Sequence, residues 1–382
     1  MEDKDVFDKH FERYPVIYLK FINITVNSHN KIIDALYSKS CEIMEMYEYF
    51  IEDPGISIKC KRVFNRLNKK SLPNIIRFYK GLCILLYQYY GIAPVILIDE
   101  CDHPIREIMR KYPEGEDYEK VVKIFQDFYV GLFKENEHRS YSVFTGIDRL
   151  IKARVSSPLN LEEEPIISGD LVEYYSFSEN DVEELLKKLE YTKHAHNEIK
   201  KAFKDMLNGY LIADEMIYNC FSIIKALKEI KTRYKNKPID TESRNFKDNV
   251  LKCYWYQSYP LTNILNAFKS WRCSELFYRI FKEESISSPL KHLNNSENKL
   301  RMTRAMYSTS QNQEDPYAKK KIIYDMDIVL SFLVAHGYLT KKPNSEGIYD
   351  VLIPNEEMRE SLKEFHQFLN LEMMKEDEKT LY

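Results

Sequence analysis

Two neighbouring carboxylates, Asp99 and Glu100, directly follow a short apolar run and could do chemistry there. The run, residues 95–98, has the unbroken aliphatic pattern of a strand buried on both faces, as in parallel sheets. An aspartate at the carboxyl end of such a strand could hold Mg²⁺ on nucleotide phosphates, directly or through water. The glutamate beside it could orient or deprotonate an attacking water. The alternative is a core strand that ends in surface carboxylates, because short motifs often arise by chance.

The elements that must position these side chains follow from the periodicity of the chain. Strands are predicted over residues 14–21, 95–98 and 140–146, helices over 28–51, 59–67, 71–90 and 118–134, and a loop over 104–115. Alternating strands and helices predict a parallel α/β sheet with right-handed crossovers. Because parallel strands end on the same side of a sheet, we expect Thr145 to lie beside Asp99 and Glu100.

Three cations follow the third predicted strand: Arg149, Lys152 and Arg154. At the carboxyl edge of the sheet they could face phosphates, and Arg149 is the candidate for that contact. The alternative is a solvated loop, and for any single one of these cations we favour that alternative.

The pattern changes after residue 177, where Ser178 is a predicted helix N-cap with acids in the following turn. Helical patterns continue to residue 281, while the polar stretches 231–249 and 294–316 predict exposed connections. The last part predicts a helix, a hairpin and a closing helix, an order typical of a winged-helix unit. Its elements are expected at 321–336, 338–340, 348–353 and 355–371, with Gly337 ending the first helix.

Composition bounds the class of protein. The chain has 382 residues, of which 44% are hydrophobic and 30% charged, so two or three packed domains are expected. Seven scattered cysteines without a C-x-x-C pair indicate reduced thiols in an intracellular protein, cytoplasmic or nuclear. The net charge of −3 gives no general case for nucleic acid, and no run approaches the roughly 20 apolar residues of a membrane helix.

Taken in order, several stretches resemble one family, the AAA-ATPase-like domain, a group of P-loop proteins often followed by a PD-(D/E)XK nuclease-like domain. The segment from Leu97 to Ile105 is similar to its Walker-B stretch, L-I-D-E-Y-D-x-P-I, and residues 143–147 to its F-x-T-G-V segment, where a sensor residue sits. Further similar stretches are 14–19, 208–210, 218–224, 331–340 and 353–356. Cys220 and Phe221 stand where the family has Pro-Trp.

The resemblance implies a P-loop-NTPase-like sheet over residues 1–176, a helical domain over 177–300 and a winged-helix-like unit over 317–372. It implies that ATP and Mg²⁺ are the cofactors and that Asp99 binds the metal. Glu100 would be the catalytic residue, and Thr145 and Arg149 would contact the nucleotide.

One departure from the family bears on function. The sequence contains no G-x-x-x-x-G-K-[ST] loop, the Walker A element, and we expect no nuclease part within these 382 residues. Without that loop there is no cradle of backbone N–H groups and no lysine on the phosphates. We therefore expect ATP and Mg²⁺ to bind weakly unless the site is completed from elsewhere, and enzyme activity stays an open question.

Two hypotheses follow. The chain is a truncated or degenerate AAA-ATPase-like protein acting as a non-catalytic scaffold for an unidentified protein partner. Alternatively, it is an ATP-hydrolysing P-loop ATPase if a missing N-terminal segment supplies the loop. Nucleic-acid binding by the last unit has the least support, because its basic run at 319–321 is offset by an acidic end at 376–378. No membrane partner is expected.

Overall fold

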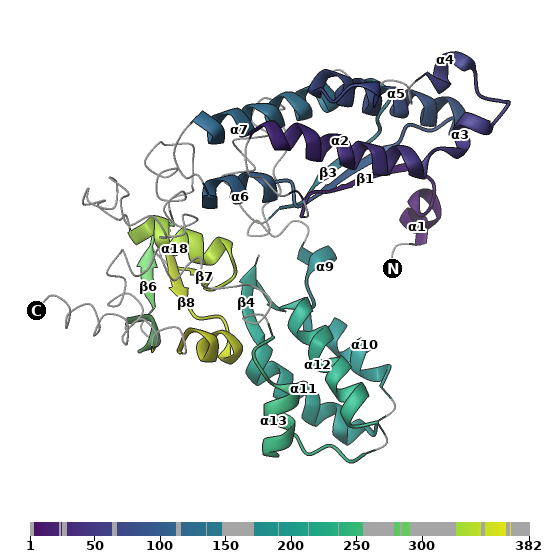
Figure 1. Ribbon diagram of the computed structural model, residues 1–382. Coiled ribbons are helices and arrows are strands. Elements are labelled where there is room, and N and C mark those ends of the chain that lie inside the picture. Colours follow the sequence, from purple (N-terminus) through teal and green to yellow (C-terminus); the bar gives the residue numbers. More distant parts are fainter. Residues whose placement is uncertain are drawn as a thin grey trace, which may run out of the picture. The chain divides into compact units, whose positions relative to one another are not determined.

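In a computed structural model, the chain divides into two compact units, residues 1–162 with 295–308 and residues 163–294 with 309–382 (Figure 1). The domain boundaries predicted at 176, 300 and 317 remain predictions. The structure describes residues 4–22, 24, 29–62, 67–111, 116–134, 136–146, 172–189, 191–212, 214–235, 237–254, 279–282, 285–290, 326–344, 348–363 and 367. The predicted connection over 294–316 and most of the predicted helix ending at 281 lie outside these residues.

The first unit is built on a three-stranded parallel sheet. Its strands are β1 (Val16–Lys20), β2 (Val95–Asp99) and β3 (Ser142–Phe144), and β2 lies in the centre. The predicted parallel α/β sheet, with residues 95–98 as its central strand, is therefore confirmed. In register, Ile17 pairs with Ile96 and Leu19 with Ile98, so these four side chains share one face.

Helices cover that face. The three long ones, α2 (His29–Met46), α5 (Leu72–Tyr90) and α7 (Glu116–Tyr129), run along one side of the sheet (Figure 1). As predicted, α5 begins after Ser71 with a proline in its first turn and ends at Gly91, which has a φ of 71°. The shorter helices are α1 (Lys4–His10), α3 (Tyr49–Glu52) and α4 (Ile58–Lys61), and a π-helical turn, η2 (Val130–Lys134), extends α7.

The other face of the sheet is open. Val16, Tyr18 and Val143 are 42%, 46% and 51% exposed on it, and Leu97 is only half-buried. The prediction that this strand is buried on both faces is therefore wrong. An apolar run shows that a strand is hydrophobic, but it does not show whether a second layer of helices is present to cover it.

A second correction concerns the segment after the acidic pair. Residues 103–111 form a helix, α6 (His103–Lys111), where a loop over 104–115 was predicted. Pro104 lies in the first turn of α6, where its missing N–H group would have no intrahelical partner anyway. Ile105 and Ile108 are fully buried and hold the helix on the core.

The second unit begins with helices α9 (Val172–Tyr175), α10 (Glu179–Lys187) and α11 (Lys193–Leu207). The predicted N-cap at Ser178 is confirmed, since its hydroxyl accepts from the Asp181 N–H group while the Asp181 carboxylate accepts from the Ser178 N–H group. An antiparallel hairpin, β4 (Asn208–Ile212) and β5 (Glu215–Tyr218), follows and was not predicted.

Helix α12 (Cys220–Arg233) is then joined to α13 (Arg244–Val250). The stretch over 231–249 is thus only partly the exposed connection that was predicted. Phe246 and Val250, one helical turn apart, are fully buried and give α13 an apolar face within a polar sequence.

The last part contains α18 (Met326–Ala335), an antiparallel sheet in the order β6-β8-β7, and a helix over 356–363. The strands are β6 (Ile286–Ser288), β7 (Thr340–Pro343) and β8 (Tyr349–Leu352). The predicted order of helix, hairpin and closing helix is confirmed, and Gly337 follows α18 with a φ of 75°. Two details were wrong: β6 was missed, and β7 begins at residue 340, where the first strand of the hairpin was expected to end.

The family-like motifs of the second unit meet in one place. Gly209 has a φ of 139°, and a Cβ atom there would overlap the carbonyl oxygen of Pro354. The side-chain amide of Asn355 donates to the Leu207 carbonyl at 3.0 Å, and the Leu211 N–H group donates to the Thr340 hydroxyl at 3.0 Å. The backbone of the motif over 208–210 therefore packs directly against the backbone of the motif over 353–356.

A fully buried carboxylate, Glu357, completes this contact. Its Oε1 accepts from the Ser222 hydroxyl at 2.8 Å and from the Tyr254 N–H group at 2.9 Å. We call Gly209, Ser222, Pro354, Asn355 and Glu357 the Glu357 junction. Because Ser222 belongs to α12 beside Ile223, the prediction that the last part packs on the helices around Ile223 is confirmed.

Candidate active site at the carboxyl edge of the sheet

Asp99 is the last residue of β2 and lies on the open face of the sheet. Lys20 pairs with it in register and Tyr18 lies two residues earlier on β1, so all three side chains share that face. Thr145, which follows β3, donates from its hydroxyl to Asp99 Oδ1 at 2.5 Å. The Tyr18 hydroxyl donates to Oδ2 at 3.0 Å, and Lys20 Nζ lies 3.9 Å from the same oxygen.

These contacts favour the ionised carboxylate. The hydrogen bond from Thr145 is the main reason that the pKa of Asp99 is lowered, with Tyr18 and Lys20 acting in the same direction and partial burial opposing them. The bond to Asp99 also raises the pKa of the Tyr18 phenol. Both oxygens of Asp99 therefore already have a donor at neutral pH.

Glu100 sits at a sharp turn between β2 and α6. Its φ of 56° is in the left-handed region, and its carbonyl accepts from the His103 N–H group at 3.0 Å. Its carboxylate is directed to α6, where Oε2 lies 2.7 Å from Nη2 of Arg106. Arg106 Nε also lies 3.1 Å from Oδ2 of the buried Asp102.

Burial is the largest influence on Glu100 and raises its pKa, with Asp102 and Asp99 adding to the effect and Arg106 opposing it. The turn is fixed by a bond from the Cys101 N–H group to the Thr145 carbonyl at 2.9 Å. Gly146 fits against the same turn, because a Cβ atom there would lie 2.5 Å from Asp102 Oδ1.

The structure thus brings Asp99 and Thr145 together as predicted, while Glu100 is the next residue along the chain and pairs with α6. Arg149, Lys152 and Arg154 lie outside the described residues. Sequence reasoning missed three partners at this edge: Tyr18, Lys20 and Arg106. The alternation of Tyr18 and Lys20 with buried residues could have placed them on one face of the sheet. Their position along the strand relative to Asp99 depends on the strand register, which the pattern does not give.

The fit to ATP and Mg²⁺ is partial. The carboxylate of Asp99 and the hydroxyl of Thr145 are the hard oxygen ligands that Mg²⁺ prefers. Within the part of the chain that the structure describes, no group of three or more His, Cys, Asp or Glu side chains is arranged to hold a metal ion. The sequence also has no glycine-rich loop with its lysine. These residues therefore fit the metal only as one side of a larger nucleotide site.

Comparison with known proteins supports the family. Residues 1–156 match the AAA-ATPase-like family, described as "Predicted AAA-ATPase". The resemblance is therefore confirmed for this part of the chain, which includes Asp99, Glu100 and Thr145. None of the curated proteins and none of the solved structures matches the chain. Among the described helices, none has the length and apolar character needed to cross a membrane.

Proposed function

We propose that this chain is a degenerate AAA-ATPase-like protein that serves as a non-catalytic scaffold for a protein partner. The observation that supports this most is that protein groups already satisfy both candidate carboxylates. Thr145 and Tyr18 donate to Asp99, and Arg106 pairs with Glu100 at 2.7 Å.

The physical argument concerns what a nucleotide would have to displace. Phosphoryl transfer depends on holding the phosphates in line and neutralising their charge, and the carboxylates act only on phosphates so held. To orient a water, Glu100 would have to leave Arg106, whose side chain is only 12% exposed. Breaking a largely buried ion pair leaves a buried charge without its partner, which is unfavourable.

The test is a titration of ATP·Mg²⁺ by calorimetry together with a phosphate-release assay on the wild type, Glu100→Gln and the exposed control Glu137→Gln. We expect feeble binding and background release in all three proteins. Tight binding with turnover that is lost in Glu100→Gln and kept in Glu137→Gln would overturn the proposal.

The second candidate function is ATP hydrolysis, and the family match over residues 1–156 favours it. It requires an N-terminal segment that supplies a G-x-x-x-x-G-K-[ST] loop. Asp99, kept ionised beside Thr145, would then hold Mg²⁺, Glu100 would activate water, and Arg149 would contact the nucleotide. Sequencing the transcript upstream of Met1 tests this, since a loop found there would reverse our preference.

Finer features of the architecture belong to the same proposal. We propose that β1, β2 and β3 are part of a P-loop-NTPase-like sheet, with a Walker-B-like element at Asp99. We also propose that α18, the β6-β8-β7 sheet and the helix over 356–363 are a winged-helix-like unit. We also propose a place inside the cell, in the cytoplasm or nucleus, which the reduced thiols of Cys41, Cys83 and Cys220 support.

A further inference from the structure

Helix α12 presents a row of cations with an aromatic ring at one end. Its buried face consists of Ser222, Ile223, Ala226 and Ile230. On the opposite side, residues follow one another at offsets of 4, 3, 4 and 3, the spacing of one helix face, and all are exposed. We call this set the α12 row: Phe221, Lys225, Lys228, Thr232 and Lys235, the last lying just beyond the helix end.

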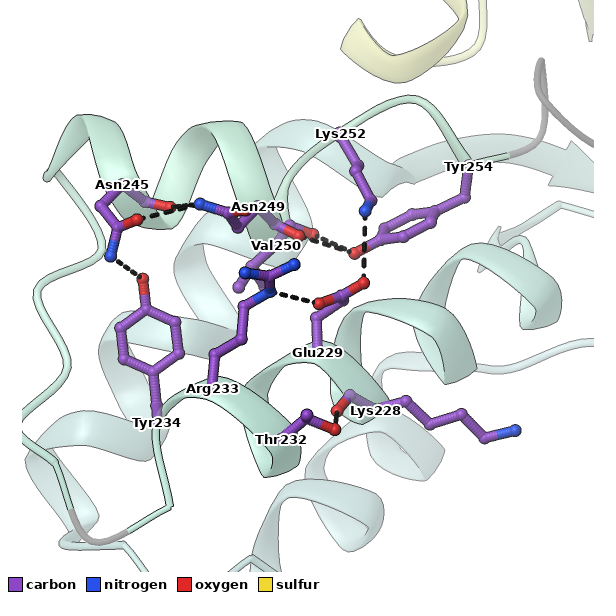
Figure 2. A network of polar contacts seen from close by, with 10 residues as sticks. All are labelled: Lys228, Glu229, Thr232, Arg233, Tyr234, Asn245, Asn249, Val250, Lys252 and Tyr254. Carbon is purple, nitrogen blue, oxygen red and sulfur yellow. Dashed lines mark hydrogen bonds and ion pairs between the residues drawn. The ribbon is translucent and has the colours of Figure 1, made fainter.

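Among the residues that the structure describes, no acid forms an ion pair with the lysines of the α12 row. Lys225 Nζ lies 5.2 Å from the centre of the Phe221 ring, and neither Lys228 nor Lys235 makes an ion pair with any described residue. The only acid on α12, Glu229, faces α13 instead. It pairs with Arg233 of its own helix at 2.5 Å and with Lys252, just after α13, at 3.2 Å (Figure 2).

Figure 2 shows this division for Lys228. Tyr234 contacts Asn245 of α13 and Glu229 pairs with Lys252 just after α13, whereas the Lys228 side chain extends away from these contacts. Acids that follow α12 are also engaged: Glu242 pairs with Lys247 at 2.6 Å, and Asp240 accepts from the Glu242 N–H group. A positive row therefore remains on a chain whose net charge is −3.

We propose that the α12 row binds single-stranded nucleic acid, with its lysines along the phosphates and Phe221 stacked on a base. Lys225 and Lys235 are ten residues apart, which is about 15 Å along a helix and spans several phosphates. Single-strand sites combine a cationic track with aromatic rings that stack on bases. An acidic protein segment would also pair with the lysines, but an exposed ring among cations is the combination typical of single-strand sites, so we favour nucleic acid.

The experiment measures fluorescence anisotropy of a labelled 20-nucleotide single strand titrated with the whole chain over a series of salt concentrations. The test variant carries Lys225→Gln, Lys228→Gln and Lys235→Gln. We expect at least tenfold weaker binding and a salt slope smaller by about 2, since each phosphate contact on a single strand contributes about 0.7.

A matched control removes the same charge elsewhere, with Lys9→Gln, Lys31→Gln and Lys69→Gln, all exposed in the first unit. Its affinity for the strand should stay within about twofold of the wild type, because it loses the same net charge but keeps every lysine of the α12 row. If both triple variants bind like the wild type, or if both lose affinity equally, the assignment to α12 is wrong.

Phe221→Ala distinguishes nucleic acid from an acidic partner. Phe221 is 40% exposed, so circular dichroism should show an intact fold. Loss of one stacked base predicts at least about fivefold weaker binding with an unchanged salt slope. If Phe221→Ala binds like the wild type, or if poly-glutamate displaces the oligonucleotide as well as unlabelled strand does, the row serves an acidic protein and the proposal fails.

Discussion

The chain contains two sites organised around a carboxylate, Asp99 and Glu357, and the two are built differently. At the carboxyl edge of the sheet, the Asp99 side chain is 34% exposed and its partners are side chains on an open face. At the Glu357 junction, the carboxylate is fully buried and its partners include a backbone N–H group. Asp99 is open to solvent, whereas Glu357 is closed off from it. Resemblance to a family motif therefore does not tell whether a carboxylate is accessible or holds the fold.

The largest expected effect comes from Gly209→Ala in the junction. The new Cβ atom would overlap the Pro354 carbonyl oxygen, and a φ of 139° is unsuited to alanine. We expect the free energy of unfolding of the second unit to fall by at least about 3 kcal/mol, measured by urea denaturation. The control is Gly91→Ala in the first unit, where φ is 71°. An added Cβ atom there would meet no atom within 4 Å apart from those of the adjacent residues, so only the left-handed strain of about 1–2 kcal/mol applies. Equal losses in the two variants would contradict the close-approach argument.

A smaller effect is expected from Glu357→Ala. The substitution removes the acceptor of the buried Ser222 hydroxyl and the Tyr254 N–H group, which should lower the free energy of unfolding by about 2–4 kcal/mol. Glu360→Ala, three residues along the same helix, removes only an exposed pair with Lys363 and should cost less than about 1 kcal/mol. A Glu357→Ala variant as stable as Glu360→Ala would show that the junction does not hold the unit together.

The smallest effect is expected at the sheet edge, from Thr145→Val. Without the hydroxyl, the pKa of Asp99 should rise toward its ordinary value of 3.8, which carboxyl NMR titration can follow. A lowered folded pKa contributes stability that is present above the unfolded value and lost as pH falls through the folded one. Thr145→Val should therefore reduce stability at pH 7 and leave it unchanged in strong acid.

Glu100 provides the internal reference for that titration. Its pKa is raised by burial, so its contribution has the opposite sign: stability decreases as pH rises from its ordinary value of 4.5 through the folded one. Thr145→Val should change the Glu100 titration less than that of Asp99, because Thr145 donates to Asp99 and reaches Glu100 only through the charge of Asp99. Equal shifts of the two carboxyl groups would contradict the assignment of the Thr145 bond to Asp99.

Much of the fold could be predicted because local signals agreed with it. The strands at 16–20 and 95–99 and helix α5 have apolar patterns and end signals that match their tertiary environment. The β4–β5 hairpin was missed because the contact that stabilises it is distant in sequence. Gly209 has to be a glycine because the Pro354 carbonyl, near the end of the second unit, packs against it. Helix α6 was missed because a proline is compatible with a loop and also with the first turn of a helix, where Pro104 lies.

The candidate site could be predicted only as far as strand order allows. Parallel neighbours end together, which placed Thr145 beside Asp99, and the hydrogen bond between them confirms that placement. The pairing of Glu100 with Arg106 depends on a left-handed φ at Glu100 and on a helix starting three residues later. Neither feature is encoded in the apolar pattern, so the direction of that side chain could not be foreseen.

The contact between Leu207 and Asn355 joins residues 148 positions apart, and this has a consequence during translation. Ribosomes add about 5–20 residues per second, so Asn355 is made roughly 7–30 seconds after Leu207. The sheet of the first unit has all three strands once residue 144 has emerged. Nascent chains should therefore carry the complete sheet of the first unit and an open β4–β5 hairpin for most of the synthesis of the second unit, and a premature stop before Pro354 would leave that hairpin exposed to chaperones and proteases.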